Sequence, residues 1–475
     1  DPKTYALLKR CATTAVFQLE SRGMKELIKK LKPDNFEEII ALVALFRPGP
    51  LESGMVDDFI NRKHGAKVEY PFVELEEVLG PTYGGIVYQE QVMKISQIIG
   101  NYSLGGADLL RRAMGKKKLE EMAKQRSIFM SGASELGFDE KKAGDLFDLM
   151  EKFAGYGFNK SHSAAYALIS YQTAWLKAHY PAAFMAAVLS SDMDNTDKVV
   201  MLIDECRHMQ LEVLPPNVNN CEYMFTSQGE NSIYYGLGAI KGVGEAALES
   251  IVRERNENGL YADLFDFCRR IDSRKVNRRV LEAMIRAGAL DGMAPNRATL
   301  MASLGVAMQS AEQHQRNEAQ GMEDLFGGPA VEMQAVELKT MAEWPEKERL
   351  EGEKDTLGLY LTGHPITQYE HELERVITSR LVNVQASRDR SEQTVAGLVV
   401  ALQTRNTKSG ERMGFMTLDD RSGRLEVAAF RDIYKQFQHL IAKDKLLVIK
   451  GNVREDDYSG GLRMQASPIY DIDEA

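Results

Sequence analysis

The sequence is poor in cysteine, and this scarcity narrows the kinds of protein that it can encode. Among 475 residues only four are cysteine, namely Cys11, Cys206, Cys221 and Cys268. None belongs to a Cys-x-x-Cys pair or has a histidine at zinc-finger distance. The pattern argues against a disulfide framework and a structural zinc site. We expect reduced, mostly buried thiols in a cytoplasmic protein.

Long apolar runs are also missing. No stretch approaches the ~20 apolar residues needed to span a bilayer, and no signal-peptide pattern precedes Asp1, so we expect no membrane contact. The formal net charge of −10 argues against a wholly basic nucleic-acid coat, although the positive charges are unevenly distributed. Because the chain begins without methionine and within a helical pattern, we expect it to be a fragment of a longer polypeptide.

The length predicts several domains, because 475 residues are too many for one hydrophobic core. Helical periodicity dominates from residue 1 to about residue 210. The pair Pro215-Pro216 then marks a boundary, and the Gln-, Glu- and Met-rich stretch between about residues 310 and 343 is typical of a flexible connector. From Thr394 the period changes to two, which indicates strands.

Residues 153–163, Phe-Ala-Gly-Tyr-Gly-Phe-Asn-Lys-Ser-His-Ser, form a polar elbow between two helical patterns. Before it, one helix face with a cap at Asp139 is indicated by Ala143, Leu146, Phe147, Met150 and Phe153. After it, the spacing recurs, up to a stop at Pro181, in Ala165, Leu168, Ile169, Gln172, Trp175 and Leu176. Asn159, Lys160, Ser161 and His162 begin the second helix, where free N–H groups favour an anion. An ordinary capped helix–loop–helix explains the elbow equally well.

Basic residues crowd the span 111–126. They are Arg111, Arg112, Lys116, Lys117, Lys118, Lys124 and Arg126. Such a run is usually a solvated helix face. Arg111 and Arg112, however, stand within an apolar run, where partly desolvated guanidinium groups would suit bidentate phosphate contact.

Residues 237–244, Leu-Gly-Ala-Ile-Lys-Gly-Val-Gly, resemble the turn of a helix-hairpin-helix. In that element Gly242 and Gly244 would let backbone N–H groups approach a DNA phosphate, and Lys241 would add charge. A hairpin that serves only packing is the alternative. A degenerate second copy follows in residues 276–290, with Arg278 and Arg279 on its face.

The connector contains one apolar anchor, residues 322–328, Met-Glu-Asp-Leu-Phe-Gly-Gly. Adjacent Leu325 and Phe326 with the acidic neighbour Asp324 suit the apolar groove of a partner protein. A plain loop is a close competitor.

Five strands after Thr394, with a helix between the third and the fourth, predict an oligonucleotide-binding (OB) barrel. Single-stranded DNA could stack on Phe415 and Phe430 and meet charge from Arg405, Lys408 and Arg412. Both phenylalanines fall on alternating positions, however, so we expect them in the barrel core. A barrel that contacts only protein is a further alternative.

Five motifs follow one another along the chain. They are Phe17-Gln-Leu-Glu-Ser-Arg-Gly-Met24, Leu45-Phe-Arg-Pro-Gly-Pro50, Tyr88-Gln-Glu-Gln91, Leu110-Arg-Arg-Ala-Met114 and Tyr156-Gly-Phe-Asn-Lys-Ser-His-Ser163. Together they resemble the family C replicative DNA polymerases of bacteria, the alpha subunits of DNA polymerase III. The resemblance implies a mainly α multidomain chain that ends in an all-β OB barrel. The implied domains are fingers (1–210), a clamp-binding region with tandem helix-hairpin-helix (211–340), a connecting segment (341–390) and an OB domain (391–475).

The resemblance also implies roles for particular residues. Arg111 and Arg112 would contact the triphosphate of the incoming dNTP, while Ser161 and His162 would lie near its sugar and help to exclude ribonucleotides. Residues Met322 to Phe326 would bind the sliding clamp, the beta subunit, although Met322 stands where that peptide usually has Gln. Other implied partners are primer–template DNA and the remaining replicase holoenzyme subunits.

Catalytic carboxylates are not evident. Polymerases hold two Mg²⁺ ions about 4 Å apart with acidic side chains. The pairs Asp192/Asp194 and Asp471/Asp473 have suitable spacing, but we interpret them as helix caps and solvated charge. The resemblance places the Mg²⁺ ligands in a palm domain that this chain lacks, so we expect no catalytic residue here and no DNA synthesis by the chain alone. The competing hypothesis is a non-catalytic DNA-binding scaffold that combines helix-hairpin-helix and OB modules.

Overall fold

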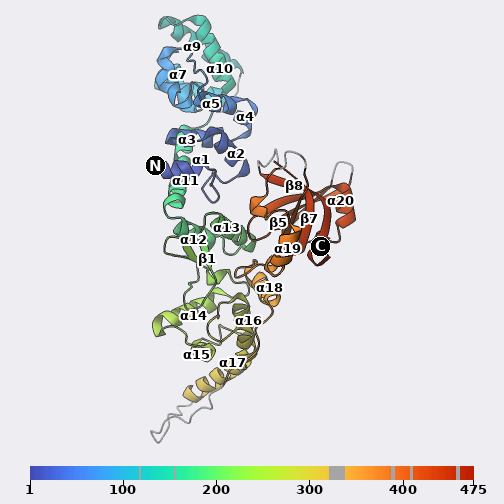
Figure 1. Ribbon diagram of the computed structural model, residues 1–475. Helices are drawn as coiled ribbons and strands as arrows, with labels where there is room; N and C mark the ends of the chain where they lie inside the picture. Colours follow the sequence, from blue (N-terminus) through green and yellow to red (C-terminus); the bar gives the residue numbers. More distant parts are fainter. Residues whose placement is uncertain are drawn as a thin grey trace. The chain divides into compact units, whose positions relative to one another are not determined.

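The computed structural model describes residues 1–116, 119–153, 157–319, 337–386, 391–406, 410–455 and 461–474. The chain divides into two compact units, residues 1–185 and 186–475. Helices make up most of the first unit, whereas the second ends in a barrel (Figure 1). No helix in the described ranges is both long and apolar enough to cross a lipid bilayer. The bounds of the four predicted domains stay predictions.

The first unit is helical, as its periodicity predicts. Its elements are α1 (Pro2–Lys9), α2 (Arg22–Leu31), α3 (Phe36–Leu45), α4 (Pro48–Glu52), α5 (Met55–Lys63), η1 (Val73–Leu75), α6 (Glu76–Leu79), η2 (Gly80–Thr82), α7 (Gln89–Ile98), α8 (Leu104–Lys116), α9 (Leu119–Glu135), α10 (Glu140–Phe153) and α11 (Lys160–His179). One core joins α1, α2, α3, α5 and α11, and a second joins α7, α8, α9 and α10. The predicted buried face of α10 and its cap, Asp139 Oδ1 to the Lys142 N–H at 2.8 Å, are confirmed.

Helix α11 is present and ends before Pro181, but it does not bury its large apolar residues. Leu168, Ile169 and Leu176 are 48%, 43% and 44% exposed. The buried face instead carries Ser163, Ala167, Ser170, Ala174 and Lys177. Small side chains let α11 lie close to α1 and α3, with which it makes extensive contact. The buried ammonium of Lys177 is satisfied by the carbonyls of Ala12 and Thr14, at 3.0 and 2.8 Å.

The first part of the second unit combines helices with a small sheet. Its elements are α12 (Pro181–Ser191), which begins at the end of the first unit, α13 (Thr196–His208), β1 (Glu212–Leu214), β2 (Thr226–Gln228), β3 (Ser232–Tyr234), η3 (Leu237–Ala239), α14 (Glu245–Asn258), α15 (Leu264–Arg270), α16 (Arg278–Ala287), α17 (Arg297–Ala319), α18 (Glu346–Leu357), η4 (Pro365–Tyr369), α19 (Glu370–Val376) and η5 (Leu381–Asn383). The sheet has the order β1-β3-β2.

Helix α17 corrects the predicted connector, because it continues through residues 310–319, where helical period had been expected to end. The start of α17 is fixed by Arg297, whose side chain is 3% exposed. Its guanidinium pairs with Asp291 at 2.8 Å and with the fully buried Glu353 of α18 at 3.0 Å. Residues 322–326, the predicted clamp peptide, lie outside the described residues.

The predicted barrel is confirmed. Its strands are β4 (Gln393–Asn406), β5 (Arg412–Asp419), β6 (Arg424–Ala429), β7 (Leu446–Glu455) and β8 (Leu462–Asp471), closed in the order β4-β5-β6-β8-β7, and η6 (Ile472–Glu474) follows. Helix α20 (Arg431–Phe437) lies between the third and fourth strands, as predicted. Alternate residues fill the core, including Met416, Leu418 and Val427. Of the four free cysteines, three are buried and Cys11 is half-buried, so the expected burial of most thiols is confirmed.

Candidate nucleotide and nucleic-acid sites

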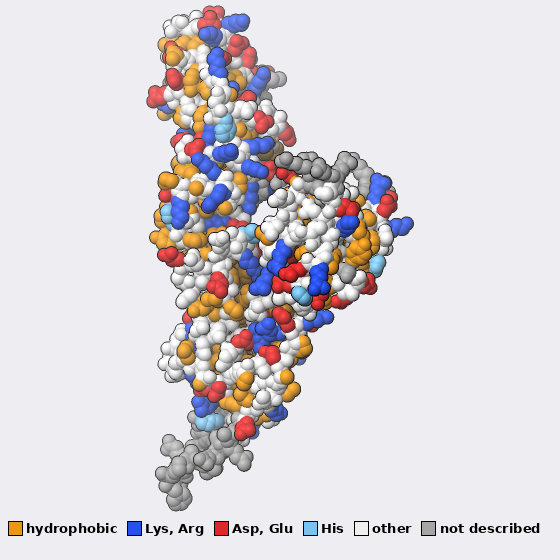
Figure 2. Space-filling model, viewed as in Figure 1, with side chains coloured by type: hydrophobic (Ala, Val, Ile, Leu, Met, Phe, Trp, Pro, Cys, Tyr) orange, Lys and Arg blue, Asp and Glu red, His pale blue; other side chains and the backbone are white. Residues whose placement is uncertain are grey.

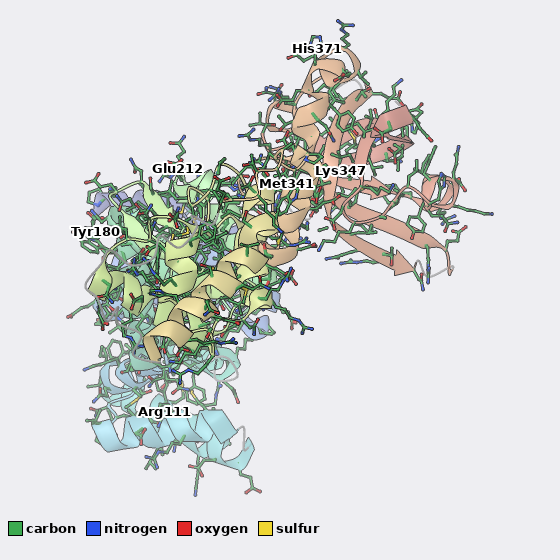
Figure 3. The ribbon with its side chains drawn as sticks, turned by 90° about the horizontal axis from the view of Figure 1, so that it is seen from below. Arg111, Tyr180, Glu212, Met341, Lys347 and His371 are labelled. Atoms are coloured by element: carbon green, nitrogen blue, oxygen red, sulfur yellow. The ribbon has the colours of Figure 1, made fainter. Side chains whose placement is uncertain are left out.

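Helix α8 presents Arg111 and Arg112, and both are held by Asp108. Arg111 donates from Nε and Nη2 to one Asp108 oxygen, at 2.9 and 2.7 Å, and Arg112 Nε reaches the other at 2.8 Å. Hydrogen bonds from Arg111 are the main reason that the pKa of Asp108 lies below its usual value. The Arg111 side chain, labelled in Figure 3, is 32% exposed, whereas that of Arg112 is 63% exposed. Partial desolvation was therefore predicted correctly for Arg111 and wrongly for Arg112.

Residues 154–156 of the elbow lie outside the described residues, and its last part leads into α11 through a capped first turn. Asn159 Oδ1 accepts from the His162 N–H at 2.8 Å, so Asn159 is the N-cap. The negative charge that the helix N-terminus favours is supplied by Glu90, whose carboxylate accepts from the Lys160 N–H at 2.9 and 3.1 Å and from Asn159 Nδ2 at 3.0 Å. Lys160 Nζ pairs with Glu37 at 2.9 Å. The carboxylate of Glu90 thus occupies the place at the start of α11 where the sequence pattern favoured an anion.

Ser161 and His162 remain open to solvent, since both are exposed. Among the residues that the structure describes, neither the Ser161 hydroxyl nor the His162 ring nitrogens have a hydrogen-bond partner. The His162 ring is held between aromatic neighbours, with centroids 4.4 Å from Tyr166 and 5.4 Å from Phe158. These two side chains can therefore donate to a ligand without giving up a bond inside the protein.

Helices α8 and α11 are brought together by the residues that begin α7. Tyr88 and Phe158 form a parallel β-bridge, in which the Gln89 N–H donates to the Phe158 carbonyl at 2.9 Å. The Gln89 carboxamide accepts from Arg111 Nη1 and donates to the Gly157 carbonyl, both at 3.2 Å. Two segments almost fifty residues apart are thus joined through Gln89. No periodicity indicated these contacts of Gln89, Glu90 and Asp108, although Gln89 and Glu90 stand in one of the quoted motifs.

The glycine-rich turn before α14 is exposed as a helix-hairpin-helix turn would require. Ile240 and Val243 are buried on either side of it, while Lys241, Gly242 and Gly244 are exposed. Gly242 has φ +83°, which L side chains rarely adopt, and Gly244 is the N-cap of α14 with open space around it. The element before the turn is the short helix η3, where the motif predicts a full helix.

The second predicted hairpin copy lies against the first. A Cβ placed on Gly242 would be 3.9 Å from that of Ala283 in α16, and Arg279 lies one turn before Ala283 on the same helix face. Arg278 and Arg279 are both exposed, and Arg278 pairs with Glu282 at 2.8 Å. Arg279 therefore stands on the helix face that meets the glycine turn.

The barrel carries an aromatic and cationic cluster on its outer surface. Phe415 and Phe430 do not join the core, so their predicted core position is wrong. The inward alternation of β5 falls on Met416 and Leu418, which turns Phe415 outward. The guanidinium carbons of Arg405 and Arg463 lie 5.8 and 5.7 Å from its ring centroid, and Phe430, 38% exposed, meets it edge-on at 6.5 Å.

The other predicted barrel residues are placed in part. Arg412 is exposed at the start of β5, opposite Asn406 of β4. Lys408 lies outside the described residues. Arg463, which sequence reasoning missed, is also held by Glu426 at 2.7 and 3.1 Å. Acidic and basic side chains are interspersed on the face shown in Figure 2.

The acidic pairs have other partners. Asp192 accepts from Lys198 at 2.7 Å, and Asp473 accepts from the Tyr369 hydroxyl at 2.7 Å. In the described part of the chain no group of three or more His, Cys, Asp or Glu residues is arranged to hold a metal ion. The described residues therefore offer no ligand set for the two metal ions of a polymerase.

Comparisons with known proteins follow the same order of modules. The family model for the bacterial DNA polymerase III alpha subunit finger domain matches residues 1–137, a helix-hairpin-helix motif matches residues 210–300, and an OB-fold nucleic acid binding domain matches residues 393–472. Curated proteins named DNA polymerase III subunit alpha match 100% of this chain at 57% identity in Pseudomonas aeruginosa and Escherichia coli K12, and at 56% in Vibrio cholerae. The resemblance to the DNA polymerase III alpha subunits is confirmed.

The DNA polymerase III alpha subunits are longer than this chain, which spans 42% of the length of each of these relatives. Among solved structures, the second OB-fold domain of replication protein A from Methanococcus maripaludis aligns with 20% of this chain and 98% of its own at 17% identity. Its TM-score of 0.17 is too low to support an argument.

Proposed function

We propose that this chain is the fingers-to-OB portion of the catalytic subunit of a bacterial replicative DNA polymerase. In this proposal residues 1–210 bind the incoming dNTP and the template. The observation that carries the proposal is the junction at Gln89, which joins Arg111 of α8 to Gly157, shortly before Ser161 and His162. A nucleotide carries a triphosphate at one end of its sugar. Its site therefore needs guanidinium groups for the phosphates and, beside them, hydrogen-bond donors for the sugar.

The contacts of each residue refine its proposed role. Arg112 is the more accessible guanidinium, so it is suited to meet the triphosphate first. Ser161 and His162 have exposed donors for the sugar edge. Asn159 and Lys160 hold Glu90 and Glu37, so their support for the nucleotide is mainly structural.

The second unit is proposed to hold DNA and a protein partner. Lys241, Gly242 and Gly244, with Arg278 and Arg279, would contact the backbone of duplex DNA without reading its sequence. The Phe415 cluster with Arg405 and Arg412 would contact single-stranded template. Residues 322–326 would bind the sliding clamp, and contacts with other holoenzyme subunits would follow from residence in the replicase.

The chemical step is proposed to depend on residues outside this chain. Mg²⁺ activates the primer hydroxyl and stabilises the leaving pyrophosphate in polymerases. The acidic pairs here are engaged with Lys198 and Tyr369, so we place the metal ligands elsewhere in the complete subunit. The purified 475-residue chain should therefore not incorporate nucleotides.

Steady-state kinetics of the complete polymerase test the nucleotide site. Loss of a hydrogen bond to a charged group costs roughly 1.5–3 kcal/mol. Arg112→Ala should therefore raise the dNTP KM, or lower kcat, by roughly tenfold to 150-fold. The Kd for primer–template should stay unchanged. The exposed Arg10 at the end of α1 provides a matched control, and Arg10→Ala should affect neither value.

The scaffold hypothesis predicts a different result. A DNA-binding protein without a nucleotide site has no separate use for Arg112. Equal losses in DNA binding and turnover for Arg112→Ala would favour the scaffold and contradict the proposed site.

A further inference from the structure

Gln89 contacts both halves of the proposed nucleotide site. Its side-chain oxygen accepts from Arg111 Nη1, and its side-chain nitrogen donates to the Gly157 carbonyl, each at 3.2 Å. Because α7 begins at Gln89, the residue is also fixed through its backbone N–H, which donates to the Phe158 carbonyl at 2.9 Å. The carboxamide is thus a rigid link between α8 and the elbow.

The packing around Gln89 leaves little freedom. A Cβ on Gly157 would lie 3.2 Å from Gln89 Cγ and 3.0 Å from a ring carbon of Phe153, so the backbone of Gly157 lies directly against the Gln89 side chain. A side chain at residue 157 would push the two apart. The absence of one lets the carbonyl reach the carboxamide.

The hydrogen bonds of Arg111 show how many of its N–H donors are left for a ligand. A guanidinium has five N–H donors. Asp108 takes one from Nε and one from Nη2, and Gln89 takes one from Nη1. One donor on each Nη then remains, which is the number that a bidentate phosphate contact requires. Asp108 and Gln89 hold the guanidinium on two sides and leave this pair available.

We propose that Gln89 is a positioning residue for nucleotide binding. It fixes the Arg111 guanidinium relative to the elbow, so that the contacts to the triphosphate and those of Ser161 and His162 to the sugar form together. This inference rests on the proposed nucleotide site and adds a residue that touches neither the phosphates nor the sugar.

Kinetics of Gln89→Leu in the complete polymerase test the proposal. Leucine has a similar size and makes neither hydrogen bond, so the dNTP KM should rise roughly tenfold, the factor that corresponds to a lost hydrogen bond to a charged group. Discrimination against ribonucleotides should fall, and the Kd for primer–template should not change. Gln97→Leu is the matched control, because it makes the same change two turns along α7 on a half-buried residue and should leave all three values unchanged.

A second variant, Gln89→Glu, separates the two bonds. Its carboxylate still accepts from Arg111 but repels the Gly157 carbonyl. The proposal predicts a raised KM and weaker discrimination in this variant too. Wild-type values would show that the elbow link is unnecessary and would overturn the proposal.

A double-mutant cycle with Arg111→Ala distinguishes the positioning role of Gln89 from the proposed nucleotide site on which it rests. Once Arg111 is gone, Gln89→Leu should raise the KM no further, whereas a general structural defect would add its full effect. Additive effects of the two substitutions on the KM would overturn the positioning role. So would an unchanged KM in Gln89→Leu if Arg111→Ala raises the KM. An unchanged KM in Arg111→Ala would instead refute the proposed nucleotide site itself.

Discussion

Removal of the Phe415 ring is a sharp test of the barrel's outer surface. Phe415 lies outside the barrel core, so Phe415→Ala should cost far less stability than the about 3–5 kcal/mol of a buried phenylalanine. A base stacked on an aromatic ring contributes roughly 1–3 kcal/mol. The Kd for single-stranded DNA should therefore rise roughly fivefold to 150-fold. The lower end applies if Arg405 and Arg463, which flank the ring, retain the strand electrostatically.

Fluorescence anisotropy with a labelled oligothymidine measures this Kd, and thermal unfolding measured in parallel checks the fold. Phe415→Tyr keeps the ring and should bind normally. Tyr470→Ala removes an aromatic side chain that is 45% exposed at the opposite end of β8 from Arg463, and it should also bind normally. An unchanged Kd for Phe415→Ala, or an equal loss for Tyr470→Ala, would refute a stacking site at Phe415.

Three further predictions concern the second unit. Gly244→Val should weaken duplex binding and flatten its salt dependence, because the added side chain covers the start of α14. The open space around Gly244 accommodates this side chain. An unchanged slope of log Kd against log salt would show that the turn serves packing only. Truncation of Leu325 and Phe326 to Ala should abolish binding to the sliding clamp in an analytical gel-filtration assay, and full retention of binding would point to another peptide. Burial lowers the pKa of His364 below its ordinary value near 6.5. As pH falls, the unfolded chain therefore binds a proton at His364 before the folded chain does. The free energy of unfolding should decrease below pH ~6.5 for this reason. His364→Gln should show a smaller loss between pH 7 and pH 5.5 in thermal unfolding, and an identical loss would count against this cause.

Periodicity predicted the fold where one type of residue fills one face. Helix α10 buries the five residues that share its apolar stripe, and the barrel follows the alternation of its strands. The prediction failed where a helix face is buried by small side chains, which allow close packing, and not by large apolar ones. Helix α11 buries Ala167, Ala174 and Lys177 because small residues and two backbone carbonyls meet there, which no single-chain pattern reveals.

The candidate site was predictable from its cations but not from the groups that hold them. Arg111, Ser161 and His162 belong to motifs with an evident resemblance. Gln89 and Glu90 also stand in one of the quoted motifs, but their contacts reach residues about 20 to 70 positions away, and such contacts leave no spacing in the sequence. Phe415 was misplaced because strand alternation alone does not say which alternate set points inward.

Photo-crosslinking of an azido-dNTP to the complete polymerase tests the central claim most directly. The label should appear in peptides from residues 105–165, which include α8 and the first turn of α11, and an excess of unlabelled dNTP should abolish it. Replacement of both Arg111 and Arg112 by alanine should reduce the labelling at least tenfold. Specific labelling that leaves this region unmodified, or that persists in the double variant, would contradict the account.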